Sequence, residues 1–169
     1  MQKPSPEEHI PYLKLYIDLV PDNDIIEELE KQVDPFSKLI TGISEEKSQY
    51  RYAPEKWSIK ELTVHILDTE RIMAYRALCI SRNEKKSLPG SDQDEYAREI
   101  DYSKITMKGL LKEFSLIRKS NILMFKNFTE EMCLRKGLSN QNPITVRALA
   151  YIIYGHAQHH MNILQEKYL

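Results

Sequence analysis

Apolar residues recur at helical spacing in four long segments, and this pattern constrains the fold of the 169-residue chain more than any other feature. In each segment an apolar side chain returns every three or four residues, so one face of a helix is apolar. No stretch alternates apolar and polar residues for long enough to predict a sheet. We therefore predict an all-α fold, with residues 1–169 forming one four-helix-bundle domain. The predicted helices span about 24–40, 58–82, 106–128 and 145–167.

Residues that cap or break helices mark several of these boundaries. Ser58 and Glu61 fit a capping box, in which each side chain accepts a hydrogen bond from the other residue's backbone amide. Thr145 is predicted to cap the last helix, and the third helix is predicted to begin near Thr106. Pro35 lacks a backbone N–H, so it is predicted to kink or split the first helix.

Two longer connections separate the helices. Residues 83–105 show no clear period and contain the turn signal Pro89-Gly90, which predicts a long crossover. Such a connection either covers a site or is a solvated strap, and both interpretations stay open. Residues 129–144 form the second connection, and residues 12–17 predict a short helix that packs on the bundle.

Composition narrows the class of protein. Lys and Arg total 24 and Asp and Glu total 25, so the net charge of −1 gives no general attraction to nucleic acid or to anionic lipid. We expect neither a nucleic-acid nor a membrane partner. The N-terminal residues do not resemble a secretory signal, and Cys79 and Cys133 lack a CxxC partner. We therefore expect a cytoplasmic protein whose cysteines behave as small apolar residues.

Two histidines lie in the apolar face of the last predicted helix. At about 100° per residue, Leu149 and Ile152 lie within about 40° of His156, and His160 lies about 40° away on the same face. Burying two imidazoles in an apolar stripe is costly unless their nitrogens find partners. The i, i+4 spacing also allows two histidines to bind one metal ion. His159 falls at the edge of the stripe and is expected outside the ligand set.

His65 points inward from the second helix, so a bundle that pairs the second and fourth helices would gather three imidazoles. His65, His156 and His160 are therefore the candidate metal ligands, against the alternative that each is an ordinary core histidine. Three histidines leave a coordination position open, as in catalytic sites. Zinc, nickel, iron and manganese all suit such ligands. Asp68 and Thr69 are candidate hydrogen-bond partners for the ligands, although each is more often an ordinary helix residue.

Arginines on the second helix are candidates for receiving an anionic group. Arg71, Arg76 and Arg82 lie on this helix, but pairing with neighbouring acidic residues on the helix surface is the favoured interpretation. Arg76 lies about 16 Å along the helix axis from His65, which is predicted to be too far for direct contact with a group at the metal.

The pattern resembles the DinB-like superfamily. The resemblance covers about residues 10–169 and is carried by the stretches Tyr52–Glu61, His65, Asp68–Arg71, Leu88–Gly90 with Asp92–Asp94, Val146–Leu149 and Tyr154–His160. It implies an up-down-down-up bundle with a long crossover, commonly a homodimer, and a divalent metal held by His65, His156 and His160 with His159 outside the triad. Ser91 departs from the family pattern, in which an aromatic residue often follows the Pro-Gly.

Members of this superfamily include enzymes that use the metal to bind and activate a low-molecular-weight thiol. The resemblance therefore implies transfer of such a thiol to an electrophilic small-molecule substrate. Hydrolysis is the alternative, but no glutamate adjoins the ligands of the last helix as in an HExxH metalloprotease. A third hypothesis is a non-catalytic metal-binding scaffold. No catalytic side chain and no organic cofactor are predicted from the sequence.

Overall fold

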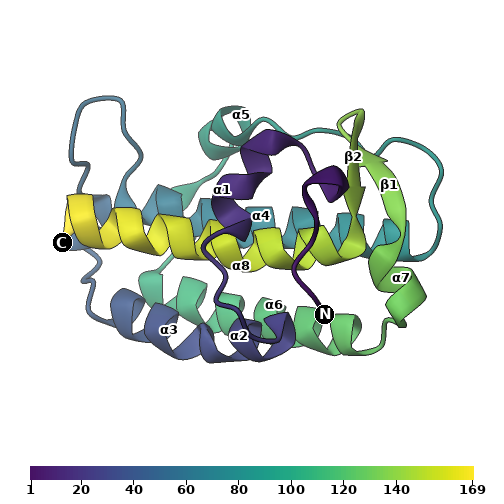
Figure 1. Cartoon of the computed structure of the whole chain (residues 1–169). Helices are drawn as coiled ribbons and strands as arrows, with labels where there is room; N and C mark the ends of the chain where they lie inside the picture. The colour runs from purple at the N-terminus through teal and green to yellow at the C-terminus, as the bar shows by residue number, and fades with distance from the viewer.

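Four long helical stretches form where the apolar periodicity predicts them (Figure 1). The computed structural model describes residues 1–169. The first stretch comprises α2 (Ile25–Lys31) and α3 (Val33–Thr41), and the others are α4 (Ile59–Ser81), α6 (Met107–Lys126) and α8 (Val146–Ile163). The smaller elements are the 3-10 turns Pro6–Glu8, Pro11–Leu13, Lys47–Gln49 and Tyr102–Lys104, the helices α1 (Lys14–Ile17), α5 (Gln93–Arg98) and α7 (Glu130–Leu134), the strands β1 (Lys136–Ser139) and β2 (Asn142–Thr145), and a final π-helical turn, Leu164–Tyr168.

The predicted caps and the predicted break are confirmed. The Ser58 side chain accepts from the Glu61 amide, and the Glu61 carboxylate accepts from the Ser58 amide. Thr106 and Thr145 each cap the helix that follows them. Pro35 lies in the first turn of α3, where its missing N–H is tolerated, and the first helix is interrupted at Gln32.

The helices run up, down, down and up, as the resemblance implies (Figure 1). Lys60 at the start of α4 donates to the carbonyl of Ile105 just before α6, so these two helices begin at the same end of the bundle. Tyr168 after α8 donates to the carbonyl of Trp57 just before α4, so α8 runs antiparallel to α4. Residues 82–106, which link two parallel helices, form the predicted crossover.

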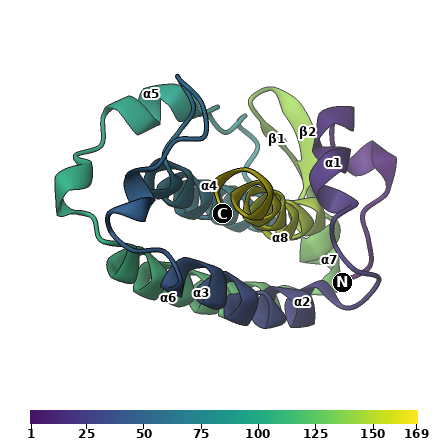
Figure 2. The same cartoon turned by 90° about the vertical axis from the view of Figure 1, so that its left-hand side faces the viewer.

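The helices α4 and α8 lie side by side at the centre of the molecule. Figure 2 shows α6, α2 and α3 on one side of this pair, and α5, α1 and the two strands on the other side. The first side contains the buried stack of Phe36 on Phe114, with ring centroids 3.8 Å apart. The second side covers the inward faces of α4 and α8. Because α8 is enclosed from both sides, its residues from Ala148 to Ala157 are all buried.

A buried polar network joins the long helices near the break at Gln32. Arg118 of α6 is fully buried and binds both carboxylate oxygens of Glu70 on α4, at 2.8 and 2.9 Å. It also donates to the side chain of Gln32 at 2.9 Å. Gln32 in turn donates to the carbonyl of Tyr154 on α8. Glu70, a neighbour of Arg71 that helix-surface pairing would place in solvent, lies instead in the core, where Arg118 neutralises it.

One short hairpin, which the sequence did not predict, accompanies the helices. Residues 136–145 form an antiparallel hairpin in which Lys136 pairs with Thr145 and Ser139 with Asn142. Each strand has only four residues, which is too short for a period of two to be recognised. Asn140 and Gln141 form the turn with φ angles of 49° and 63°, the left-handed conformation that two-residue hairpins require.

None of the helices is both long enough and apolar enough to span a lipid bilayer.

Candidate metal centre

Three imidazoles converge between α4 and α8. The Nε2 atom of His156 lies 3.0 Å from Nε2 of His65 and 3.1 Å from Nε2 of His160. The three candidate ligand atoms all lie within 4.8 Å of one another. His65 comes from the second turn of α4 and the other two from the second half of α8, so the antiparallel packing of these helices brings them together. The structure therefore gathers the three predicted residues at one point.

Burial keeps these histidines in the form that binds metals. Removal from water lowers the pKa of His65 to about 4 and that of His160 to about 3. Burial, together with the neighbouring imidazoles, also lowers the pKa of His156 well below its usual value. All three rings are therefore neutral at pH 7, and a neutral imidazole offers a lone pair to a metal ion.

The donor geometry fits a metal ion better than it fits a closed hydrogen-bond network. A ring nitrogen has one in-plane position for a partner, yet Nε2 of His156 faces two other ring nitrogens. A cation facing all three Nε2 atoms would satisfy them together. Nitrogens bound at 2.0–2.1 Å to a tetrahedral ion lie about 3.3–3.4 Å apart, close to the two shorter separations found here. His65, His156 and His160 are therefore suited to hold a divalent transition metal.

The outer ring nitrogens lack the partners that the sequence suggested. Neither Asp68 nor Thr69 forms a hydrogen bond with His65, and both side chains line a cavity instead. The Nδ1 atom of His160 is buried and has no hydrogen-bond partner. The predicted role of Asp68 and Thr69 as hydrogen-bond partners of the ligands is therefore not realised in this structure.

Aromatic rings hold the imidazoles in place instead. The Trp57 ring packs on His65 with a centroid separation of 4.8 Å, and the Tyr16 ring packs edge-on against His156 at 5.4 Å. Tyr16 reaches His156 because α1 lies directly on α8 at Gly155. A Cβ atom at Gly155 would lie 2.0 Å from the carbonyl oxygen of Tyr16, so only glycine permits this approach.

The two remaining histidines lie outside the triad. His159 is half-buried and packs against Tyr16, with ring centroids 5.5 Å apart. His9 is buried near the N-terminus, with Nδ1 2.9 Å from the carbonyl oxygen of Ile10. Neither belongs to the ligand cluster.

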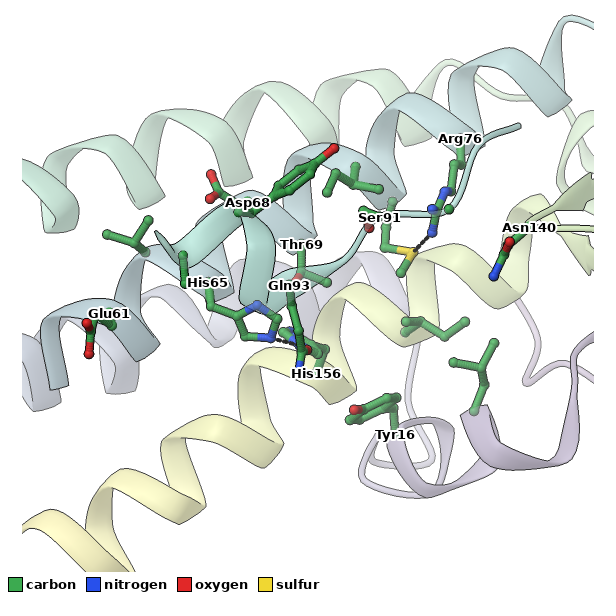
Figure 3. Close-up of a pocket in the computed structure, with 18 of the residues that line it drawn as sticks. Tyr16, Glu61, His65, Asp68, Thr69, Arg76, Ser91, Gln93, Asn140 and His156 are labelled. Atoms are coloured by element: carbon green, nitrogen blue, oxygen red, sulfur yellow. Dashed lines mark hydrogen bonds between the residues drawn. The ribbon is translucent and has the colours of Figure 1, made fainter. Parts of the chain in front are cut away.

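A cavity of about 250 Å³ reaches the histidine cluster (Figure 3). His65 and His156 form part of its wall, together with Thr69, Met73 and Tyr16. The crossover and the hairpin turn supply another part of the wall, through Gly90, Ser91, Gln93, Tyr96 and Asn140. The crossover therefore covers the site. Of the two interpretations that the sequence left open, a cover over a site and a solvated strap, the structure favours the first. Helical periodicity did not reveal these crossover residues as part of the wall, because α5 is too short to show a period.

The acidic residues of the cavity lie near the His65 end. Glu61 binds Arg51 and caps α4, so its carboxylate is already satisfied. Burial raises the pKa of Asp68, although Arg71 opposes the shift. Neither cysteine lines the cavity, and burial raises the pKa of the Cys133 thiol. No carboxylate or thiol belongs to the cluster, which consists of three histidines.

The arginines of α4 occupy three different environments. Arg71 binds Glu113 on the surface, as helix-surface pairing predicted, although its main partner lies on α6. Arg82 is exposed near the Phe128 ring. Arg76 differs from the prediction, because it is buried, has no acidic partner and lines the same cavity as His65. The α4 arginines therefore do not behave as one exposed surface group.

Comparison with known proteins agrees with this geometry. Residues 28–164 match the family model of the DinB superfamily. A protein of Oceanobacillus iheyensis named as a putative metal-dependent hydrolase is 22% identical over 150 residues, covering 84% of this chain and 86% of its own length.

Two solved structures from Bacillus subtilis share the fold. YfiT is described as a probable metal-dependent hydrolase with an unusual four-helix bundle topology. It superposes with a TM-score of 0.70 at 15% identity, covering 97% of this chain and 90% of YfiT. The DinB-like protein YjoA superposes with a TM-score of 0.59 at 20% identity, covering 85% of this chain and 88% of YjoA.

Because the family model spans most of the chain, from α2 to the end of α8, the protein belongs to the DinB superfamily.

Proposed function

We propose that this protein is an enzyme that uses a divalent metal at His65, His156 and His160 to act on a small molecule held in the adjoining cavity. The convergence of three neutral imidazoles, two of which (His65 and His156) line a cavity, carries this proposal. A purely structural metal site would have a fourth protein ligand and no cavity beside it. A metal ion in this position supplies a Lewis acid that lowers the pKa of a water or a thiol bound to it.

Our first candidate reaction is transfer of a low-molecular-weight thiol to an electrophilic substrate. The chain provides no cysteine in the cavity, so the thiol must come from solution. No hydrogen-bonded base accompanies the histidines, and a thiol needs less help from a base than water does because its pKa is lower. His65, His156 and His160 would orient the reaction centre, and the crossover would exclude bulk water.

Hydrolysis is the second candidate, and Asp68 favours it. This carboxylate lines the cavity one turn after His65, and burial raises its pKa. A carboxylate with a raised pKa is a stronger base when ionised, as a hydrolase that activates water requires. The names given to the relatives from Oceanobacillus iheyensis and Bacillus subtilis agree with this reading.

Metal content is the decisive first measurement. The purified protein should contain about one equivalent of a transition metal by plasma mass spectrometry, and His160→Ala should lose most of it, because a site with two protein ligands binds far more weakly. His159→Ala is the matched control, since it removes the adjacent imidazole outside the cluster and should retain the metal. No metal in the wild type after reconstitution with zinc, nickel, iron or manganese would refute the proposal.

The two reactions are separated by the nucleophile. With metal-loaded protein, a thiol transferase should consume a thiol and an electrophile in equal amounts, whereas a hydrolase should release products without thiol. Asp68→Asn should lower a hydrolytic rate by about 100-fold or more and change thiol transfer little. A metal-loaded protein that turns over neither class of substrate would leave the scaffold hypothesis.

A further inference from the structure

Arg76 is a buried cation that no carboxylate of the chain neutralises. Arg76 is only 7% exposed, and burial lowers the pKa of its guanidinium. The guanidinium donates to the backbone carbonyl of Pro89 at 2.9 Å and lies 3.5 Å from the sulfur of Met73. Both partners are neutral. A guanidinium offers five donors, so most of its hydrogen-bonding capacity remains.

The other arginines with largely buried side chains show how this chain usually treats such a charge. Arg118 binds Glu70 through two hydrogen bonds, and Arg147 binds Glu8. Burying an ion without a partner is costly, so these pairs are the expected arrangement. The missing counter-ion at Arg76 therefore points to an anion that comes from outside the chain.

The groups around Arg76 form a receptive end of the cavity. Ser91 and Asn140 lie there (Figure 3), and neither side chain makes a hydrogen bond within the protein. Gly90 lines the same end, and a Cβ atom on it would approach the Asn140 side chain to 3.0 Å. Glycine thus leaves this end uncrowded. A hydroxyl, an amide and a guanidinium together can donate several hydrogen bonds to a carboxylate.

The distance between the two ends defines the size of the ligand. The guanidinium of Arg76 lies beside Met73, which is eight residues from His65, or about 12 Å along the helix axis. One hydrogen bond at the Arg76 end and one metal–ligand bond at the other end take up about 5 Å of this distance. The remaining 7 Å or so equals the length of about two extended residues.

We propose that the Arg76 end of the cavity binds a carboxylate of the small molecule whose reactive group lies at the three histidines. The ligand class is thus an elongated acid of about dipeptide size, with its carboxylate at Arg76, Ser91 and Asn140. This inference rests on the proposed function for the position of the reactive group. The anion site itself depends only on Arg76 and its surroundings.

The test compares two probes that differ in one charge. The probes are N-acetyl-cysteinylglycine and its C-terminal amide, and their affinities are measured by calorimetry at pH 7 with zinc-loaded protein. The wild type should bind the acid at least about tenfold more tightly than the amide, because a hydrogen-bonded charge pair contributes at least the binding free energy of a tenfold change in affinity. Arg76→Met should reduce the preference to less than about twofold. Arg82→Met is the matched control at the end of the same helix and should keep the preference for the acid.

Each result has a definite meaning. Equal affinity of acid and amide for the wild type, or an unchanged preference in Arg76→Met, overturns the anion site while leaving the metal proposal intact. If the protein binds no metal but still prefers the acid through Arg76, the anion site stands and the proposed function fails. Thermal unfolding verifies that Arg76→Met is folded. Should it not fold, Arg76→Lys takes its place and should lower the preference, since an ammonium cannot form the bidentate pair.

Discussion

Gly155→Ala should destabilise the protein, although alanine is the better helix former. The new Cβ atom would lie 2.0 Å from the carbonyl oxygen of Tyr16 and 2.5 Å from its carbonyl carbon. Real Cβ contacts essentially never fall below 3.0 Å, so the α1 backbone must retreat by at least about 1 Å. Backbone cannot rotate away as a flexible side chain can.

The magnitude follows from two opposing effects. Alanine gains about 1 kcal/mol of helix propensity over glycine inside α8. Overpacking typically costs about 1–3 kcal/mol when the neighbours shift. If α1 leaves α8 altogether, exposure of Tyr16 and Ile17 costs about 1.5–3 kcal/mol each. The expected net loss in the free energy of unfolding is therefore about 0–2 kcal/mol if α1 only shifts, and about 2–5 kcal/mol if it leaves α8.

Urea denaturation followed by circular dichroism measures this loss, with Gly42→Ala as the matched control. Gly42 ends α3, and a Cβ atom there meets only backbone oxygens at 3.6 and 3.8 Å. This control should be neutral or slightly stabilising, because alanine restricts the unfolded chain. A Gly155→Ala protein that is more stable than the wild type, by about the 1 kcal/mol of helix propensity, would show that the contact between α1 and α8 is not as close as the structure has it.

Two further predictions concern buried ion pairs. Arg118→Met leaves the buried Glu70 carboxylate with only the Asn121 amide as a partner and no cation. This change should cost about 3–5 kcal/mol in urea denaturation, and adding Glu70→Leu should restore much of the lost stability. A fully stable single variant would contradict this. At Glu8, burial favours a higher pKa, but hydrogen bonds from Arg147, the Ser5 amide and Thr145 lower the pKa from 4.5 to about 2. Because the folded-state pKa is depressed, the contribution of Glu8 is complete above pH 4.5 and is lost as the pH falls toward 2. This contribution to stability amounts to about 1–2 kcal/mol after allowance for screening by water. Wild type and Glu8→Gln should therefore converge in their free energy of unfolding as the pH falls from 4.5 toward 2. A difference that stays constant over this pH range would refute the depressed pKa of Glu8.

The sequence predicted those features that depend on local pattern. Helical periodicity, the caps at Ser58 and Thr145, and the predicted start near Thr106 located the long helices because each signal is confined to a few neighbouring residues. The same periodicity pointed His65, His156 and His160 inward, and the packing of α4 on α8 brought them together. That they bind a metal stays a prediction until metal content is measured.

Features that depend on distant partners could not be predicted in this way. Glu70 and Arg76 look alike in sequence, as charged residues of one amphipathic helix. One is neutralised by Arg118, 48 positions away, and the other faces a cavity closed by the crossover. The hairpin likewise depends on pairing with Leu88 as well as on its own turn. Burial of a charge is decided by tertiary packing, which spacing along the chain does not encode.

The central position of α8 has a consequence for how the protein is made. This helix packs against α1, α2, α4, α7 and β2, yet it is synthesised after all of them. The inward faces of the earlier helices therefore remain uncovered until α8 emerges from the ribosome, and such exposed apolar surface favours aggregation and chaperone binding. Two of the three histidines also lie on α8, so the full triad cannot capture metal on a nascent chain that still lacks this helix.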